Sequence, residues 1–240
     1  MIKHKEFQES CTTCHLSQVC IPESMNENEV TQLDNLVNSR IKLKKKDSLF
    51  LSGDSFKAIY AIKSGSIKTT ITSRSGMEQI NGFFIQGEII GFDGFATDKH
   101  VFNAIALEDS RICVIKKHDL ESFSDKFLPL KNQIQRIMSK EIVRDNNMML
   151  LLGNMNSEQK IATFIQNISN RLNKRRNNHL AITLKMTREE MGSYLGLTNE
   201  TISRVLKKLS NLNLISIDGK ELRILDEDGL KQIIHNDCKP

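Results

Sequence analysis

Apolar residues recur at helical spacing over residues 128–152, a stretch with no Gly and, after Pro129, no further Pro. This pattern predicts one long helix, on the order of 35 Å at a rise of 1.5 Å per residue. One stripe of the helix comprises Ile134, Met138, Ile142, Met149 and Leu152. Such a stripe has to be covered, either within the subunit or by a second copy of the chain.

Asp145 interrupts this apolar stripe. In a parallel two-fold dimer the carboxylate would face its own twin, and like charges at short range in a seam of low polarity disfavour association. We therefore predict a switchable dimer seam around Met138, Ile142, Asp145 and Met149. The alternative is that Asp145 lies in water on the helix edge while the stripe packs inside one subunit.

Upstream of this helix, between about residues 49 and 115, the hydrophobic period shortens. Short β-prone runs are separated by turns that contain glycine, such as Ser64-Gly65 and Ser75-Gly76. The runs are residues 58–62, 66–72, 78–85, 89–92, 102–107 and 111–115. Many short strands joined in this way predict a sandwich or barrel. Residues 26–38 are predicted to form a short packing helix before it.

Downstream of the long helix, the pattern of residues 186–209 predicts two short helices joined by a tight turn. Thr187 and Glu190 have the spacing of a capping box for the first helix, and Thr198 can cap the second. Gly196 lies between them. Two helices joined in this way are a helix-turn-helix.

The flanks of this motif extend the prediction. Residues 157–172 have an amphipathic helical pattern, and the basic run at 174–178 is predicted to be a solvated loop. After the motif, residues 214–225 alternate around Asp218-Gly219, which is a strong hairpin signal. That hairpin would be the wing of a winged helix.

Charge points to a polyanionic partner. The 240-residue chain has a net charge of +5, and residues 155–210 contain ten Lys/Arg against four Glu. A localised basic surplus is typical of nucleic-acid binding. The N-terminus has no apolar signal region and no run reaches the roughly 18 apolar residues of a membrane span, so we expect a cytoplasmic protein. Neither a Ser/His/Asp set nor paired carboxylates suggest an enzyme.

Three cysteines lie within ten residues, at Cys11, Cys14 and Cys20. In a cytosolic chain this spacing favours metal or redox chemistry, because iron–sulfur clusters and tetrahedral zinc both take Cys ligands. A fourth ligand is missing locally, and His15 and the distant Cys113 are the candidates by type. The alternative is three unrelated thiols or a stray disulfide.

The second helix of the predicted motif carries the candidate base readers, Asn199, Glu200, Ser203 and Arg204. Arg can donate to guanine, Glu can accept from cytosine, and Ser can serve several bases. Glu200 would be repelled by phosphate, so base reading explains it better, although the helix dipole also favours a Glu in a first turn. The side chains expected to contact phosphate are Arg188, Lys207 and Lys208.

Taken together, these motifs resemble the CRP/FNR family of transcription regulators, and its FNR-type anaerobic members in particular. The resemblance rests on Cys11, Cys14, Cys20 and Cys113, on residues 141–145, and on Glu200-Thr-Ile-Ser203-Arg204. It implies an α+β fold: a β-roll (a jelly roll like cyclic-nucleotide-binding domains), a long dimerisation helix and a C-terminal winged helix-turn-helix. The expected domains are a cysteine-rich segment at 1–25, the β-roll at 26–126, the helix at 127–153 and the DNA-binding domain at 154–240.

The resemblance also implies a function. A [4Fe-4S] cluster on the four cysteines would favour a homodimer that binds a palindrome like TTGAT-N4-ATCAA and activates or represses transcription. RNA polymerase would be a partner, with the turn at residues 73–78 as a candidate contact. Relatives that bind cyclic nucleotides hold the phosphate with an Arg, but the corresponding place here reads Phe102-Asn103-Ala104, so no cyclic nucleotide is expected. The rivals are a regulator with another ligand in its β-roll and a zinc or thiol-redox regulator.

Overall fold

The computed structural model describes residues 10–23, 25–37, 39–73, 75–124, 127–173 and 181–235. The chain forms two compact units, residues 1–142 and 143–240. The predicted basic loop at 174–178 and Cys238 lie outside the described residues. Within the described part, no helix is both long and apolar enough to cross a bilayer.

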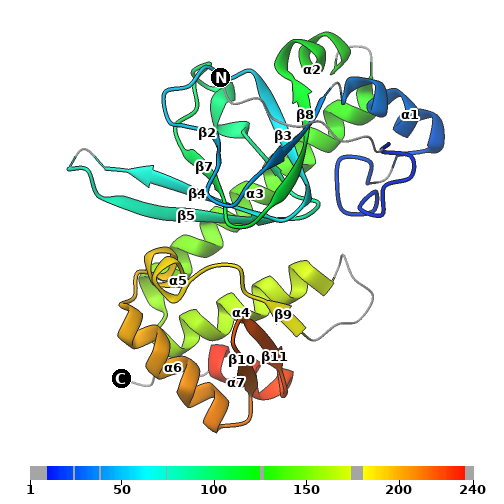
Figure 1. Cartoon of the computed structure of the whole chain (residues 1–240). Coiled ribbons are helices and arrows are strands. Elements are labelled where there is room, and N and C mark those ends of the chain that lie inside the picture. Colours follow the sequence, from blue (N-terminus) through cyan, green and yellow to red (C-terminus); the bar gives the residue numbers. More distant parts are fainter. Residues whose placement is uncertain are drawn as a thin grey trace. The chain divides into compact units, whose positions relative to one another are not determined.

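The first unit contains a β-roll made of two antiparallel four-stranded sheets (Figure 1). One sheet has the order β1-β8-β3-β6 and the other β2-β7-β4-β5. Their strands are β1 (Ser39–Leu43), β2 (Ser48–Phe50), β3 (Ala58–Ser64), β4 (Ser66–Thr72), β5 (Glu78–Ile85), β6 (Ile89–Ile90), β7 (Asn103–Ala106) and β8 (Ser110–Lys116). The predicted sandwich is therefore present.

Alternation along the strands gives the sheet β1-β8-β3-β6 two apolar faces. Ile62 and Ile112 face the second sheet and form part of the core between the sheets. Ala61 and Cys113, which are opposite each other in β3 and β8, belong to a separate core on the outer face. Cys113 therefore points away from the interior of the β-roll.

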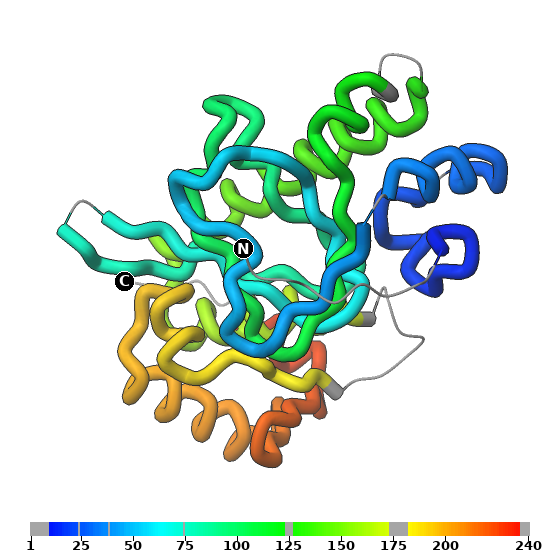
Figure 2. Tube along the Cα trace, turned by 45° about the horizontal axis from the view of Figure 1, so that its top comes forward, coloured from blue at the N-terminus to red at the C-terminus, as the bar shows by residue number. Residues whose placement is uncertain are grey.

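Helices cover this outer face. They are α1 (Glu27–Leu36), α2 (Lys117–Ser124) and the first part of α3 (Leu128–Asn154). Residues 10–23, which we call the cysteine segment, lie beside α1 in both views (Figures 1 and 2). A capping box between Asn26 and Glu29 begins α1 at the end of this segment.

The second unit holds the rest of α3 and the helix-turn-helix. Its helices are α4 (Ser157–Asn173), α5 (Arg188–Leu195), α6 (Asn199–Asn211) and α7 (Glu227–His235). A small antiparallel sheet has the order β10-β11-β9, made by β9 (Ala181–Thr183), β10 (Ile215–Asp218) and β11 (Glu221–Ile224). The predicted hairpin is β10–β11, with Gly219 at a positive φ of 56° in its turn.

Two details of the sequence prediction are corrected. The strand predicted at residues 89–92 ends at Ile90, because Gly91 takes a left-handed φ of 102° and begins the 3-10 helix η1 (Phe92–Phe95). The apolar stripe of α3 is also not uniform. Ile134 is buried in the outer core of the first unit, while Ile142 and Met149 are 61% and 64% exposed.

Candidate metal centre and nucleic-acid interface

Four thiols surround one pocket in the first unit. Cys11, Cys14 and Cys20 come from the cysteine segment, and Cys113 comes from β8. None of these four described cysteines forms a disulfide, and all four are half-buried. The rest of the lining is mostly apolar and comprises Leu16, Ile21, Pro22, Leu33, Val37, Ala61, Ile62, Lys63 and Ile115.

The cysteine segment reaches the pocket by successive tight turns. The backbone N–H of Cys14 donates to the carbonyl of Cys11 at 3.3 Å, and that of Glu23 donates to Cys20 at 3.0 Å. Leu16 and Ile21 are almost fully buried, with 1% and 2% exposure. These two apolar side chains anchor the segment to the core. The segment thus brings its three sulfurs to the pocket by turns alone, with no helix or strand between them.

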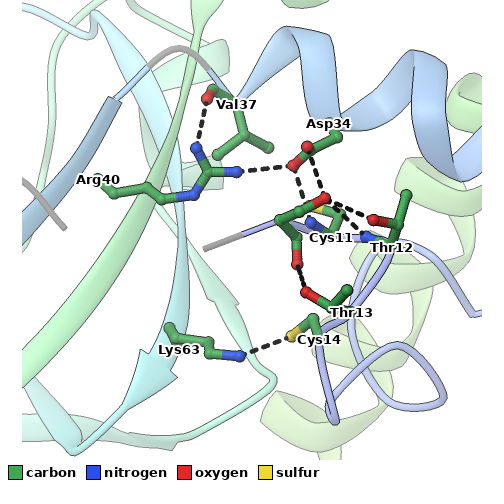
Figure 3. A network of polar contacts seen from close by, with 9 residues as sticks. Cys11, Thr12, Thr13, Cys14, Asp34, Val37, Arg40 and Lys63 are labelled. Atoms are coloured by element: carbon green, nitrogen blue, oxygen red, sulfur yellow. Dashed lines mark hydrogen bonds and ion pairs between the residues drawn. The ribbon is translucent and has the colours of Figure 1, made fainter. Parts of the chain in front are cut away.

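Asp34 of α1 ties the start of the segment to the β-roll (Figure 3). Its carboxylate accepts the Cys11 backbone N–H and the Ser10 hydroxyl, both at 2.8 Å, and pairs with Arg40 of β1 at 2.7 Å. Burial alone would raise the pKa of Asp34, but these hydrogen bonds and the Arg40 charge hold it below its usual range. Asp34 is therefore an ionised anchor at neutral pH.

The two ends of the Cys-x-x-Cys pair have different electrostatic surroundings. Burial, followed by the nearby Asp34 carboxylate, raises the pKa of the Cys11 thiol. At Cys14 the neighbour is a cation, because Lys63 of β3 donates its Nζ to the sulfur at 3.0 Å (Figure 3). A metal bound here would have to displace the Cys11 proton, since thiolates are the ligand form.

His15, the other candidate for a fourth ligand, lies elsewhere. It is exposed and lines a neighbouring polar cavity of about 350 Å³. Among the described residues, no three His, Cys, Asp or Glu side chains have the geometry to hold a single metal ion. The four thiols on one apolar pocket nevertheless have the donor chemistry of a cluster site, in which each sulfur binds a different iron.

The pocket and α3 share one core. Ile137 and Met138 of α3 pack against the same apolar cluster as Cys11, Cys20 and Cys113. Further along the helix, four large apolar side chains are more than half exposed: Ile142, Val143, Met149 and Leu150. Asp145 lies among them and is also exposed. An apolar patch of this kind on a helix is typical of an interaction surface.

The helix-turn-helix is built by local signals. The Thr187 side chain accepts the Glu190 N–H, and the Glu190 carboxylate accepts the Thr187 N–H, so the predicted capping box of α5 is present. Gly196 ends α5 with a left-handed φ of 63°. A Cβ at Gly192 would lie 2.5 Å from the Leu197 carbonyl oxygen, so the turn needs glycine there. Thr198 caps α6 as predicted.

Helix α6 presents a polar face opposite its buried one. The buried side chains are Ile202, Val205, Leu206 and Leu209. Asn199, Glu200 and Arg204 are exposed and Ser203 is half-buried, so the four predicted base readers lie on the outward side. Lys207 is exposed on the same side, one turn further along.

Two of the residues expected to contact phosphate have partners within the domain. Arg188 donates its Nη1 to the Ser203 hydroxyl at 3.1 Å, which joins α5 to the outward face of α6. Lys208 forms a 2.6 Å ion pair with Glu158 of α4. Sequence reasoning missed these contacts, and also missed Asp34 and Lys63, because none of them belongs to a local motif.

Comparison with known proteins agrees with this architecture. A Crp-like helix-turn-helix domain matches residues 159–233, and a cyclic nucleotide-binding domain matches residues 40–127. The transcriptional regulatory protein btr of Bordetella pertussis is 42% identical over 93% of this chain and 93% of its own length. The fumarate and nitrate reduction regulatory protein of Escherichia coli strain K12 is 41% identical over 93% of this chain and 89% of its own.

Solved structures give the same fold. The structure of FixK2 from Bradyrhizobium japonicum covers 81% of this chain and 96% of its own, with a TM-score of 0.74 at 22% identity. That likeness supports the predicted order of β-roll, long helix and C-terminal helix-turn-helix. With the identity to curated regulators over nearly its whole length, the chain belongs to the CRP/FNR family as a DNA-binding transcription regulator of the FNR type, not an enzyme.

Proposed function

We propose that this regulator responds to oxygen through a [4Fe-4S] cluster held by Cys11, Cys14, Cys20 and Cys113. The observation that carries the proposal is the gathering of these thiols around one pocket, although Cys113 is far from the others in sequence. The oxygen lability of the cluster would supply the signal. The chain supplies the ligands, an apolar lining and the neighbouring charges.

Those charges suit such a group. A cluster with four thiolate ligands is anionic, and cations nearby stabilise it. Lys63 contacts Cys14 directly, and Arg40 offsets the charge of the Asp34 carboxylate that anchors Cys11. Zinc on the same thiols is the rival that shares these features, so metal identity decides between the two.

In this proposal, α3 transmits the state of the pocket to a homodimer seam. Met138 packs against the core of the cysteine ligands, and Ile142 and Met149 are exposed beyond it. The repulsion between two Asp145 carboxylates keeps the dimer marginal. A coupling free energy of about 1–3 kcal/mol is then sufficient to shift the population.

The dimer would read a palindrome like TTGAT-N4-ATCAA. Glu200, Ser203 and Arg204 would contact base edges, with Asn199 at the outermost base. Lys207 would contact phosphate. Lys208 and Arg188 would do so through donors not used in their internal contacts, since Lys has three N–H donors and Arg five. Arg188 would also hold Ser203 in place.

A contact with RNA polymerase is part of the same proposal. The turn between β4 and β5 carries Met77, which is 71% exposed. An exposed large apolar side chain at a hairpin tip is suited to a protein partner. Binding of cyclic nucleotides is not proposed, because Asn103 accepts the Ser52 N–H and donates to Thr70 within the sheet, at the place where a phosphate-binding Arg would stand.

Anaerobic purification tests the proposal. The protein should be brown, contain iron and sulfide in equal amounts, lose both in air, and change from dimer to monomer as it does. Cys113→Ser should abolish the iron, whereas the matched control Cys238→Ser should keep it. Colourless protein with zinc on the four thiols would contradict the sensor while leaving DNA binding intact.

A further inference from the structure

We propose that Lys63 is a positioning residue for Cys14 and that its hydrogen bond to the sulfur sets the reduction potential and air lifetime of the bound cluster. This inference rests on the proposed function. Lys63 is not one of the proposed ligands. Its hydrogen bond would make the environment of the Cys14 sulfur differ from that of the other three.

Strand alternation gives Lys63 its position. The pairing of β3 with β8 runs through Ala61↔Cys113 and Ile62↔Ile112, then shifts so that Ser64 pairs with Arg111. Lys63 is two residues beyond Ala61 in β3, so its side chain lies on the outer face of the sheet, as Cys113 does. Its Nζ is 3.0 Å from the Cys14 sulfur.

The surroundings strengthen this contact. Lys63 is the charged side chain in the described lining of the thiol pocket, whose other members are cysteines, aliphatic residues and a proline. A charge-assisted hydrogen bond is stronger in apolar surroundings such as the lining on the thiol side of Lys63. At the other end of the motif, Asp34 accepts the Cys11 backbone N–H. Among the described contacts of the Cys-x-x-Cys pair, the Cys14 sulfur is the one that accepts a hydrogen bond from a cation.

Lys63 also lies at the boundary of the pocket. Its side chain lines the neighbouring polar cavity together with Ser10, Thr13, His15, Ser64 and Arg111. The stem of Lys63 therefore separates the thiols from a hydrophilic space. This determines the variant of choice, because Met keeps the apolar stem and removes only the ammonium group.

The Lys63 ammonium is expected to raise the reduction potential of the cluster. Adding one electron to the cluster makes it more negative, and no proton or ligand has to leave. A cation that donates to a ligand sulfur stabilises this reduced state, because hydrogen bonds to the sulfurs are among the determinants of cluster potential. Lys63 therefore raises the potential and makes loss of electrons to oxygen less favourable.

The experiment compares anaerobically prepared holoproteins. Lys63→Met removes the cation, Lys63→Arg retains a cationic N–H donor, and Lys42→Met removes a charge from β1 outside the linings of both pockets. The potential is measured by redox titration with a mediator and dithionite as electron donor. Lys63→Met should shift the reduction equilibrium about fivefold toward the oxidised cluster, the order expected of one hydrogen bond. It should also lose its absorbance faster in air.

The controls separate the possible failures. Lys63→Arg and Lys42→Met should stay within about twofold of the wild type, because the first retains the donor and the second changes a residue that lines neither pocket. Absence of iron and sulfide from the wild type would refute the proposed function itself. A loaded wild type with the same potential as Lys63→Met would overturn the role of Lys63 alone. If Lys63→Met fails to load, loading of Lys63→Arg supports the role, and failure of both variants refutes it.

Discussion

Glu23 of the cysteine segment and Lys140 of α3 form an ion pair, with 3.1 Å between the carboxylate oxygen and the ammonium nitrogen. The same oxygen accepts a longer hydrogen bond of 3.4 Å from the buried Gln133. The backbone N–H of Glu23 also donates to the Cys20 carbonyl, so Glu23 joins a candidate ligand to the helix that carries the proposed dimer surface. This contact is a direct physical link between the pocket and α3.

We predict that Glu23→Gln reduces the difference in dimerisation between the cluster-bound and cluster-free states. The ion pair is partly exposed, so the expected effect is at most about 1 kcal/mol, or a few-fold in the ratio of the two dimerisation constants. Sedimentation equilibrium with and without oxygen measures both constants. The exchanged pair Glu23→Lys with Lys140→Glu should restore the ratio, and Lys131→Gln on the same helix should leave it unchanged. Equal weakening of both states would show that Glu23 stabilises the fold and does not transmit the signal.

Local sequence signals predicted the elements that position the sites. The helix expected at residues 128–152 is present as α3 over Leu128–Asn154, because its apolar residues recur at helical spacing over many turns and no Pro follows Pro129. The capping residues Thr187 and Thr198 were identifiable because a cap needs only its own helix. Short strands such as β1 were not predicted, since Arg40 and Lys42 make the run look like a charged loop.

The tertiary partners of the thiols could not be predicted from the chain alone. Residue types alone left both His15 and the distant Cys113 as candidates, and strand pairing places Cys113 beside Ala61 on the outer face. In the sequence, Asp34 has the pattern of an ordinary exposed residue of a helix. Its contact with Cys11 is seen only in the folded structure. Lys63 contacts a sulfur that is 49 residues away in sequence, and no local pattern indicates that contact.

The reading face of α6 gives a second prediction. Arg204→Ala should weaken binding to the cognate half-site by about 1–3 kcal/mol and relax specificity at the contacted base. Lys207→Ala should weaken cognate and random DNA alike, because a phosphate contact carries no sequence information. Binding titrations on both DNAs at fixed salt distinguish the two effects. Equal losses on both DNAs for both variants would refute the assignment of Arg204.

A buried Asp–His pair gives a prediction about pH. Asp93 and His100 lie 3.1 Å apart with 6% and 1% side-chain exposure, and Asp93 also accepts the Val101 N–H at 2.8 Å. Burial alone would raise the pKa of Asp93, but the hydrogen bonds from His100 and Val101 hold it below its usual range. With a folded-state pKa below the unfolded one, this carboxylate stabilises the fold above about pH 4, and the contribution is lost as pH falls through the folded-state pKa.

Asp93→Asn should therefore lower the free energy of unfolding by about 1–3 kcal/mol at pH 7 and by less in acid. Urea unfolding of the reduced, metal-free protein at pH 7 and pH 3.5 measures the difference. The matched control is Asp98→Asn, since Asp98 is exposed and pairs with Lys117 on the surface. An Asp93 effect independent of pH would mean that the charge of the carboxylate is not what stabilises the fold.

The exposed stripe of α3 provides the sharpest test of the dimer. Asp145 lies between Ile142 and Met149, both of which are more than half exposed, so removal of its carboxylate removes the charge from this exposed stripe. We predict that Asp145→Ala dimerises and binds the palindrome in air, because the repulsion between the two carboxylates is lost while the apolar contacts remain. Asn146→Ala, which alters the next exposed residue, should remain monomeric in air. Sedimentation equilibrium and a DNA-binding titration, both under air, measure the outcome. A monomeric Asp145→Ala would show that charge repulsion is not what keeps the dimer marginal.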